Sequence, residues 1–188
     1  MRRLLLSLVL LAAPAFAQDC PEPGDLRQGI VVTRASGLTE TWRQDPTDPD
    51  LIHVIERDGG EEVLRLSLIH GIFIVSEVWS GTNWDPIITT FAATPPLPAA
   101  KATVTVMTEV VGTGLATEAE EISVRYGTPE VLALGECRIT ALRAEVSYPF
   151  YVERLLYLPD FRMSLLIYDP VDPWQDSNPV VTMHPSKS

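Results

Sequence analysis

The stretch LIHVIERDGGEEVLRLSLI, residues 51–69, decides the fold class of this chain. Apolar and polar residues alternate on both sides of Asp58-Gly59-Gly60, which is typical of two β-strands because successive side chains of a strand point to opposite faces. Paired glycines adopt the positive backbone angles of a tight turn at little cost. The stretch therefore predicts an antiparallel hairpin of strands Leu51–Arg57 and Glu62–Ile69.

Charges beside this turn favour one register of the hairpin. A two-residue turn sets Arg57 opposite Glu62, whereas a three-residue turn sets Glu56 opposite the same glutamate. Opposite charges facing across a hairpin contribute roughly 0.2–1 kcal/mol, and like charges cost a similar amount. We expect the first register, which gathers on one face the residues Leu51, His53, Ile55, Leu64, Leu66 and Leu68.

The same alternation recurs along most of the chain, and the turns between the runs are short. Short connections imply antiparallel neighbours, because a parallel crossover needs a dozen or more residues. We therefore expect an all-β domain, an antiparallel meander that forms a curved sheet, an incomplete barrel or a sandwich. Helix is expected only as a turn or two around Thr117–Glu121 or just after Gly24. The further predicted strands are Gly29–Ala35, Leu38–Arg43, Ile72–Trp79, Ala102–Val110, Glu120–Tyr126, Val131–Val146, Tyr151–Leu158 and Met163–Tyr168.

Prolines divide the chain into segments. Ala92–Lys101 contains three prolines and cannot lie inside a sheet, because proline fixes φ and lacks a donor. We expect this segment to cross from one side of the sheet or barrel to the other within a single domain, residues 18–168. Four more prolines after Asp169 predict an extended tail, residues 169–188.

The first 17 residues have the pattern of a signal peptide. Arg2 and Arg3 precede an apolar run, Leu4–Ala13, which is too short to span a membrane. The small residues of Ala15-Phe16-Ala17 predict cleavage before Gln18. No later segment is long and apolar enough for a membrane-spanning helix, so we expect a periplasmic or secreted protein.

Charge and cysteine content limit the function classes further. The chain has 25 acidic and 14 basic residues and a formal net charge of −11, so phosphate backbones would repel it and nucleic acid is not an expected partner. Its two cysteines, Cys20 and Cys137, predict one disulfide in an oxidising compartment. Such a bridge closes a loop of roughly 118 residues. Because it lowers the chain entropy of the unfolded state, it is expected to stabilise the fold by about 4–5 kcal/mol.

The search for catalytic and metal-binding motifs is negative, so no catalytic residue, cofactor or metal ligand is predicted. His53 and His70 are separated along the predicted hairpin and are interpreted as structural. Two acidic stretches offer oxygens suited to calcium but lack the glycine turn and distal glutamate of an EF-hand, so we interpret them as turns. They are DPTDPD with Asp45, Asp48 and Asp50, and DPVDPWQD with Asp169, Asp172 and Asp176.

Tryptophans provide the remaining candidates for a functional surface. Trp42 and Trp79 fall in predicted strands and are expected in the core. Trp84 and Trp174 fall in loops, so we interpret them as a possible contact surface.

Several short motifs resemble a group of small exported bacterial proteins of unknown function. They are CPEPGDL at residues 20–26, Gly29-Ile30, GEC at residues 135–137, and YLPD at residues 157–160 followed by SLL at residues 164–166. The resemblance covers most of the chain after the signal peptide. It implies no activity, cofactor or catalytic residue.

We therefore expect a non-catalytic exported module that binds a protein partner or a small apolar ligand. A hydrolase whose acidic residues meet only in three dimensions is the alternative. An interior filled with side chains would favour a protein partner, whereas an apolar cavity of a few hundred Å³ would favour a ligand. A cleft with two acids of raised pKa would favour the hydrolase.

Overall fold

A computed structural model describes residues 19–81, 86–111, 118–135, 137–167 and 177–186. The segment expected as a signal peptide lies outside these residues, as do Trp84, Trp174 and the second acidic stretch. No helix within the described residues is long and apolar enough to cross a membrane.

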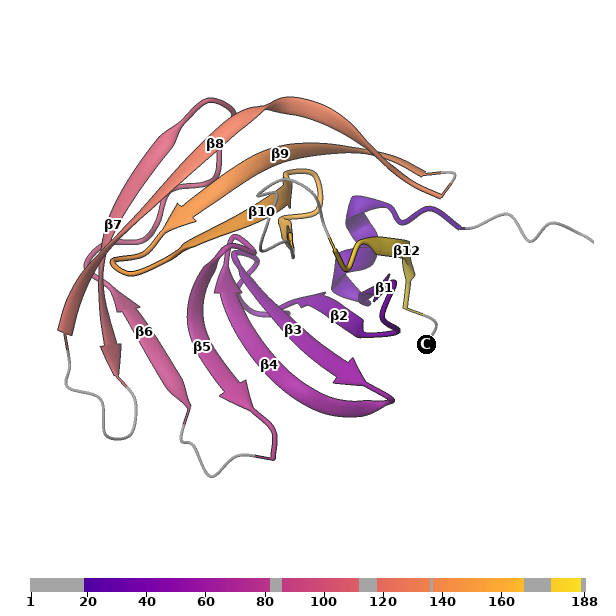
Figure 1. The fold of residues 1–188 in the computed structure, drawn as a ribbon, viewed down its shortest axis with the longest axis horizontal. Helices are drawn as coiled ribbons and strands as arrows, with labels where there is room; N and C mark the ends of the chain where they lie inside the picture. The colour runs from indigo at the N-terminus through magenta and orange to yellow at the C-terminus, as the bar shows by residue number, and fades with distance from the viewer. Residues whose placement is uncertain (1–18, 82–85, 112–117, 136, 168–176, 187–188) are drawn as a thin grey trace, which may run out of the picture.

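The described strands form one antiparallel sheet, whose order is β11-β10-β9-β8-β7-β6-β5-β4-β3-β2-β1-β12 (Figure 1). From β1 to β11, every strand neighbours the next one in sequence. Strand β12 does not lie beside β11 and instead returns to pair with β1. The elements are the 3-10 helix η1 (Pro23–Arg27) and the strands β1 (Ile30–Arg34), β2 (Thr39–Gln44), β3 (Leu51–Asp58), β4 (Glu61–Ile69), β5 (Phe73–Trp79), β6 (Ile87–Phe91), β7 (Thr103–Val111), β8 (Glu118–Leu134), β9 (Cys137–Ser147), β10 (Val152–Leu158), β11 (Met163–Leu166) and β12 (Val180–Pro185).

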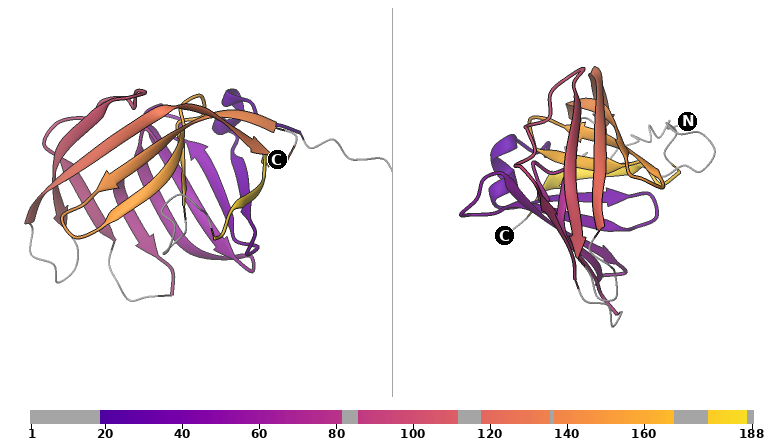
Figure 2. Two further views of the ribbon diagram at one scale, coloured as in Figure 1. Left: turned by 45° about the horizontal axis from the view of Figure 1, so that its top comes forward. Right: turned by 90° about the vertical axis from the view of Figure 1, so that its left-hand side faces the viewer.

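This sheet is strongly curved and does not close. In Figures 1 and 2, β7–β10 arch over β2–β5, and β11 and β12 are the two free edges. The all-β antiparallel meander is therefore confirmed, and its form is one curved, open sheet. Its concave side provides the interior of the molecule.

Three elements differ from the sequence-based expectation. The strands β6 and β12 were not predicted. Ala92–Lys101 does not cross to another side of the sheet, because it connects β6 to its direct neighbour β7. The segment instead folds back against the sheet, where Pro95 is fully buried and its carbonyl accepts a hydrogen bond from His70 Nε2 at 3.1 Å.

The long hairpin β8–β9 also corrects the prediction. Its strands meet at Gly135, in the left-handed region with φ of 60°, whereas Val131–Val146 was expected to be one continuous strand. Strand β8 absorbs Pro129 at an irregularity in its pairing with β9, so the proline does not end the strand. A helix around Thr117–Glu121 is absent from the described part, where β8 begins at Glu118, but η1 confirms the helical turn near Gly24.

The hairpin β3–β4 confirms the predicted turn register and corrects the predicted faces. Arg57 pairs with Glu62, as expected. A β-bulge then inserts Val63 as an extra residue, so that Glu56 pairs with Leu64 and the alternation shifts by one. The core side chains of β3 are therefore Ile52 and Val54, in place of those predicted, Leu51, His53 and Ile55.

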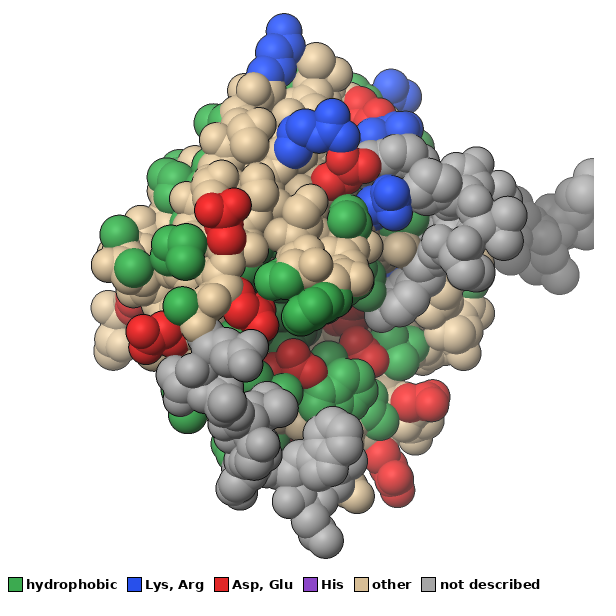
Figure 3. All heavy atoms as spheres, turned by 60° about the vertical axis from the view of Figure 1, so that its left-hand side comes forward, with side chains coloured by type: hydrophobic (Ala, Val, Ile, Leu, Met, Phe, Trp, Pro, Cys, Tyr) green, Lys and Arg blue, Asp and Glu red, His purple; other side chains and the backbone are tan. Residues whose placement is uncertain are grey.

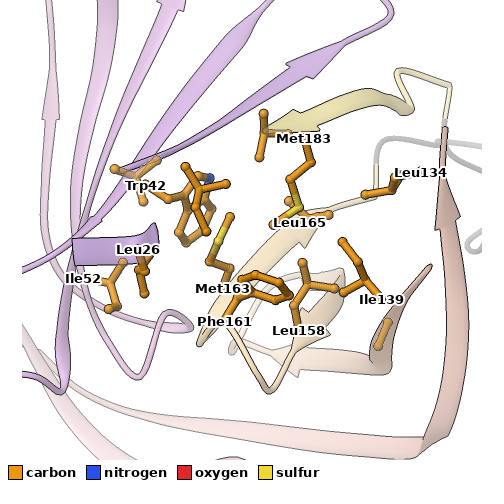
Figure 4. Packing of buried hydrophobic residues seen from close by; sticks show 14 of the residues in the cluster. Leu26, Trp42, Ile52, Leu134, Ile139, Leu158, Phe161, Met163, Leu165 and Met183 are labelled. Atoms are coloured by element: carbon orange, nitrogen blue, oxygen red, sulfur yellow. The ribbon is translucent and has the colours of Figure 1, made fainter. Parts of the chain in front are cut away.

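The turn between β10 and β11 fills one end of the concave side. Figure 4 shows Leu158, Phe161 and Met163 pointing toward Trp42 and Ile52 on the opposite part of the sheet. All five side chains are at most 5% exposed. Trp42 is thus confirmed as a core residue, and this end of the molecule is packed like an ordinary protein interior.

The predicted disulfide is confirmed. Cys20 and Cys137 are bonded, with their Cα atoms 5.5 Å apart. The bond ties the segment before η1 to the start of β9, and Leu26 of η1 packs into the same core.

A buried arginine spans the gap between the two ends of the sheet. Arg34 on β1 is 1% exposed and donates from Nη1 to the carbonyl of Leu166 on β11 at 3.1 Å. Its Nε donates to Glu40 Oε1 at 2.6 Å, and Glu40 Oε2 accepts from Trp42 Nε1 at 2.9 Å. The guanidinium therefore replaces the missing strand pairing with a side-chain bridge.

Replacing Arg34 by methionine is expected to destabilise the protein by about 3–5 kcal/mol, because it leaves Glu40 buried without its cation. The double variant Arg34→Met/Glu40→Gln should recover part of the lost stability, since glutamine is uncharged and still accepts the hydrogen bond from Trp42 Nε1. Urea unfolding followed by circular dichroism measures both. Equal midpoints for Arg34→Met and the unmodified protein would contradict the bridge.

A second contact joins the β4–β5 turn to the β10–β11 turn. Gly71 has φ of 71°, and a Cβ atom built on it would lie 1.8 Å from the carbonyl oxygen of Arg162. The two backbones can approach this closely only because residue 71 has no side chain. Ser164 Oγ donates to the Gly71 carbonyl at 2.6 Å and holds the contact.

We expect Gly71→Ala to destabilise the protein by about 3 kcal/mol or more, the sum of left-handed strain and overpacking. Gly81→Ala is the matched control, because Gly81 has φ of 75° but nothing within 4 Å of a built Cβ. The free energy of unfolding of this control should fall by only about 1–2 kcal/mol. Similar losses for the two variants in chemical denaturation would show that the close approach is unimportant.

Candidate functional site

The end of the concave side that the β10–β11 turn does not fill contains two adjoining cavities. The larger cavity, about 320 Å³, lies among side chains of β1–β5, β10 and β11. The smaller cavity, about 250 Å³, lies among side chains of β5–β9 and the β9–β10 turn. They share the lining residues Ile72, Ile74 and Glu77, so the two cavities adjoin at these residues.

Apolar side chains make most of the cavity walls. In each strand, every second residue points to the concave side, so the alternation seen in the sequence produces a continuous apolar lining. The wall of the larger cavity includes Val54, Leu64, Leu66, Leu68 and Leu155, and that of the smaller cavity includes Phe73, Ile87, Phe91, Ile122 and Val146.

Two β-bulges turn glutamates into this apolar site. The bulge at Val63 sets Glu56 opposite Leu64, and side chains of directly opposed residues lie on the same face. A second bulge inserts Val75 in β5, so that Glu77 pairs with Leu66. Without the bulges, Glu56 and Glu77 would lie on the opposite face from Leu64, Leu66 and Leu68.

Three further glutamates line the site from other strands. Glu153 on β10 borders the larger cavity, and Glu120 on β8 borders the smaller one. Glu40 on β2 is the glutamate already bound to Arg34. Arg34 is the one basic residue among the described side chains that line either cavity.

Burial raises the pKa of two of these carboxyls, Glu56 and Glu153. Burial is the largest cause that raises the pKa of Glu56, followed by the negative charge of Glu40. Burial also raises the pKa of Glu153, against a hydrogen bond that Tyr148 Oη donates to it at 3.3 Å, and the charge of Glu77 raises it further. The site therefore holds carboxylates in surroundings that disfavour their ionisation.

Exposed aromatic side chains are part of the lining of both cavities. The rings of Tyr148 and Tyr151 stack with centroids 4.4 Å apart. Phe150 is 91% exposed and Trp79 is 43% exposed, yet both line a cavity. Trp79 Nε1 donates to Glu77, so the expectation that Trp79 is a core residue is wrong.

The space-filling view shows hydrophobic and acidic side chains together on one face of the molecule. In Figure 3, green and red side chains lie together around a hollow in the lower half of the face, and blue side chains gather above it. Hydrophobic and acidic groups therefore share this hollow.

Other residues singled out from the sequence have local structural roles. Asp45 accepts hydrogen bonds from the backbone and hydroxyl of Thr47, both at 2.7 Å, and from His53 at 3.0 Å; these bonds, that from Thr47 first, lower its pKa. The first acidic stretch is thus a self-capped turn, as interpreted. His70 lies elsewhere, with Asp50 3.5 Å from its Nδ1.

The structure does not test the proposed contact surface of Trp84 and Trp174, since both fall outside its described ranges. Among the described residues, no group of three or more His, Cys, Asp and Glu side chains could hold a metal ion. The residues that do form the site, Glu56, Glu77, Glu153 and the aromatic rim, were missed because their faces depend on bulges and on the curvature of the sheet.

Comparison with protein-family models, curated proteins and solved structures gave no match.

Replacing Glu153 by glutamine should raise stability at neutral pH. A carboxyl with a raised pKa in the fold contributes stability below the ordinary glutamate pKa, near 4.5, and loses it as the pH rises through the folded value. Glutamine does not ionise, so it removes this loss of stability at high pH. It still accepts the hydrogen bond from Tyr148 Oη. The gain in thermal midpoint should be present at pH 7 and disappear below about pH 4.5.

Glu121→Gln on the exposed side of β8 is the control, and it should change the midpoint little at either pH. A stability gain for Glu153→Gln that is the same at pH 4 and pH 7 would contradict the assignment of a disfavoured charge.

Proposed function

We propose that this protein is a non-catalytic exported module that binds a small apolar ligand in the two cavities of its open sheet. The observation that carries the proposal is the larger cavity, about 320 Å³, with walls made mainly of Leu, Ile, Val and Trp side chains. Cavities that hold small molecules are typically about 300–1,000 Å³, mostly apolar and furnished with a few polar groups.

The contrast between the two ends of the interior supports a binding role. Protein interiors are close-packed, and an unfilled apolar space forfeits dispersion contacts. The β10–β11 turn fills one end, with Phe161 and Met163 at most 5% exposed, while the other end stays hollow. An interior with one sealed end and one hollow end suits a ligand that enters from the hollow side.

The chemistry of the chain supports an exported location. The disulfide between Cys20 and Cys137 is compatible with an oxidising compartment, and the first 17 residues have the pattern of a signal peptide. A small ligand is favoured over a protein partner, because the interior is not filled with side chains.

One observation favours a second candidate function, a hydrolase. Glu56 and Glu153 both line the larger cavity, and both have raised pKa values, as a general acid requires. Incubation of the purified protein with ester, peptide and glycoside substrates tests this candidate. Turnover that Glu153→Gln abolishes in a folded variant would replace the binding proposal with the hydrolase.

Filling the larger cavity should block ligand binding. Leu66 lines the cavity, and tryptophan at this position would occupy the apolar volume that the ligand needs. The fluorescence of the neutral apolar dye N-phenyl-1-naphthylamine should rise on binding to the unmodified protein. Leu66→Trp should weaken this binding at least about tenfold, equal to about 1.4 kcal/mol.

Leu97→Trp is the matched control, because Leu97 is 55% exposed and lines neither cavity. Its dye affinity should equal that of the unmodified protein. Absence of dye binding to the unmodified protein, or equal affinities for the two variants, would refute binding in the cavity.

A further inference from the structure

Three glutamates line the two adjoining cavities and lie near one common residue, Tyr151. Glu77 lines both cavities, Glu153 borders the larger one and Glu120 the smaller one. They come from β5, β10 and β8, strands that the curvature of the sheet brings to opposite sides of the same space. Their charges act on a common neighbour: burial and then the charges of all three raise the pKa of Tyr151 to about 12.

This group of three, which we call the carboxylate cluster, has no basic partner within the described residues. Every described ion pair involves other carboxylates. Arg34, the basic residue of the lining, lies 2.6 Å from Glu40 and is bound there. Figure 3 agrees, because its blue side chains lie away from the hollow. The cluster is therefore an uncompensated negative charge at the edge of an apolar space.

Aromatic rings flank the carboxylate cluster. Tyr148 and Tyr151 stack on each other beside Glu153, and Trp79 donates its indole hydrogen to Glu77. The face of an aromatic ring carries partial negative charge, so it attracts ammonium groups, and quaternary ammonium ions are typically recognised in this way. The carboxylates and the aromatic ring faces therefore both attract a cation.

We propose that the ligand is a cationic amphiphile, an apolar chain or ring system that ends in an amine or quaternary ammonium group. The apolar part occupies the larger cavity against Leu66 and Leu68, and the cation lies in the carboxylate cluster. This assignment rests on the proposed function, since it names the class of ligand for the same cavities.

Charge complementarity selects this class over the other amphiphiles. An anionic head group, such as a fatty-acid carboxylate, would lie beside like charges in a partly buried site, where repulsion is strong. A neutral apolar molecule would cover Glu77 and Glu153 and remove their water without supplying a counter-charge, which costs free energy. Only a cation compensates the carboxylates that binding desolvates.

Three ligands with the same decyl chain test the proposal on the full mature protein. They are decyltrimethylammonium, the net-uncharged decyldimethylamine N-oxide, and decyl sulfate, each used below its critical micelle concentration. Displacement of N-phenyl-1-naphthylamine reports their affinities. We expect the ammonium to bind at least about tenfold more tightly than the N-oxide, and the sulfate more weakly than both.

Variants then locate the source of this preference. In Glu77→Gln/Glu153→Gln, the ratio of ammonium to N-oxide affinity should fall to near one. Glu61→Gln/Glu121→Gln is the matched control, because it removes two charges from exposed positions outside both cavities and should keep the ratio.

The outcomes separate this inference from the proposed function. Dye binding without any preference for the ammonium, or a preference that both double variants retain, overturns the cationic assignment and leaves the apolar cavity in place. Failure of the neutral dye to bind the unmodified protein overturns both.

Discussion

The guanidinium of Arg34 is the interaction on which this architecture most depends. A sheet that curves without closing has two edge strands, each unpaired on one side, and native proteins must protect such edges. Here the side chain reaches across the gap, binds a carbonyl of β11 and pairs with Glu40. Because Trp42 donates to the same glutamate, the bridge is linked to the core. This buried polar network therefore helps to set the separation of the edges and the volume between the arms of the sheet.

The sequence predicts the parts of the fold that follow from local alternation. Most strands, the antiparallel pairing and the turn that sets Arg57 opposite Glu62 are visible in the pattern, and two cysteines allow one pairing. The short strand β6 and the edge strand β12 were missed, because a few apolar residues beside prolines do not stand out as strands. The predicted strands Glu120–Tyr126 and Val131–Val146 leave a gap that contains Pro129, whereas β8 runs through this proline from Glu118 to Leu134.

The candidate site could not be predicted in the same way. Whether Glu56 and Glu77 lie on the same face as Leu64, Leu66 and Leu68 depends on single inserted residues, Val63 and Val75, because a one-residue shift reverses the faces of a strand. The energy that decides such a bulge is a fraction of a kcal/mol per side-chain pair, which alternation alone cannot resolve. Trp79 shows the same limit, because its strand was predicted and its exposed position at the strand end was not.

The return of β12 to pair with β1 has a consequence for the order of folding. Ile30 pairs with Pro185, near opposite ends of the described chain, so this contact has a very large separation in sequence. Until residues 180–185 have been synthesised, β1 has β2 on one side and an open edge on the other. Such non-local pairing forms late and slowly. A nascent chain therefore carries an open strand edge until residues 180–185 emerge, and the fully buried Met183 then covers that edge.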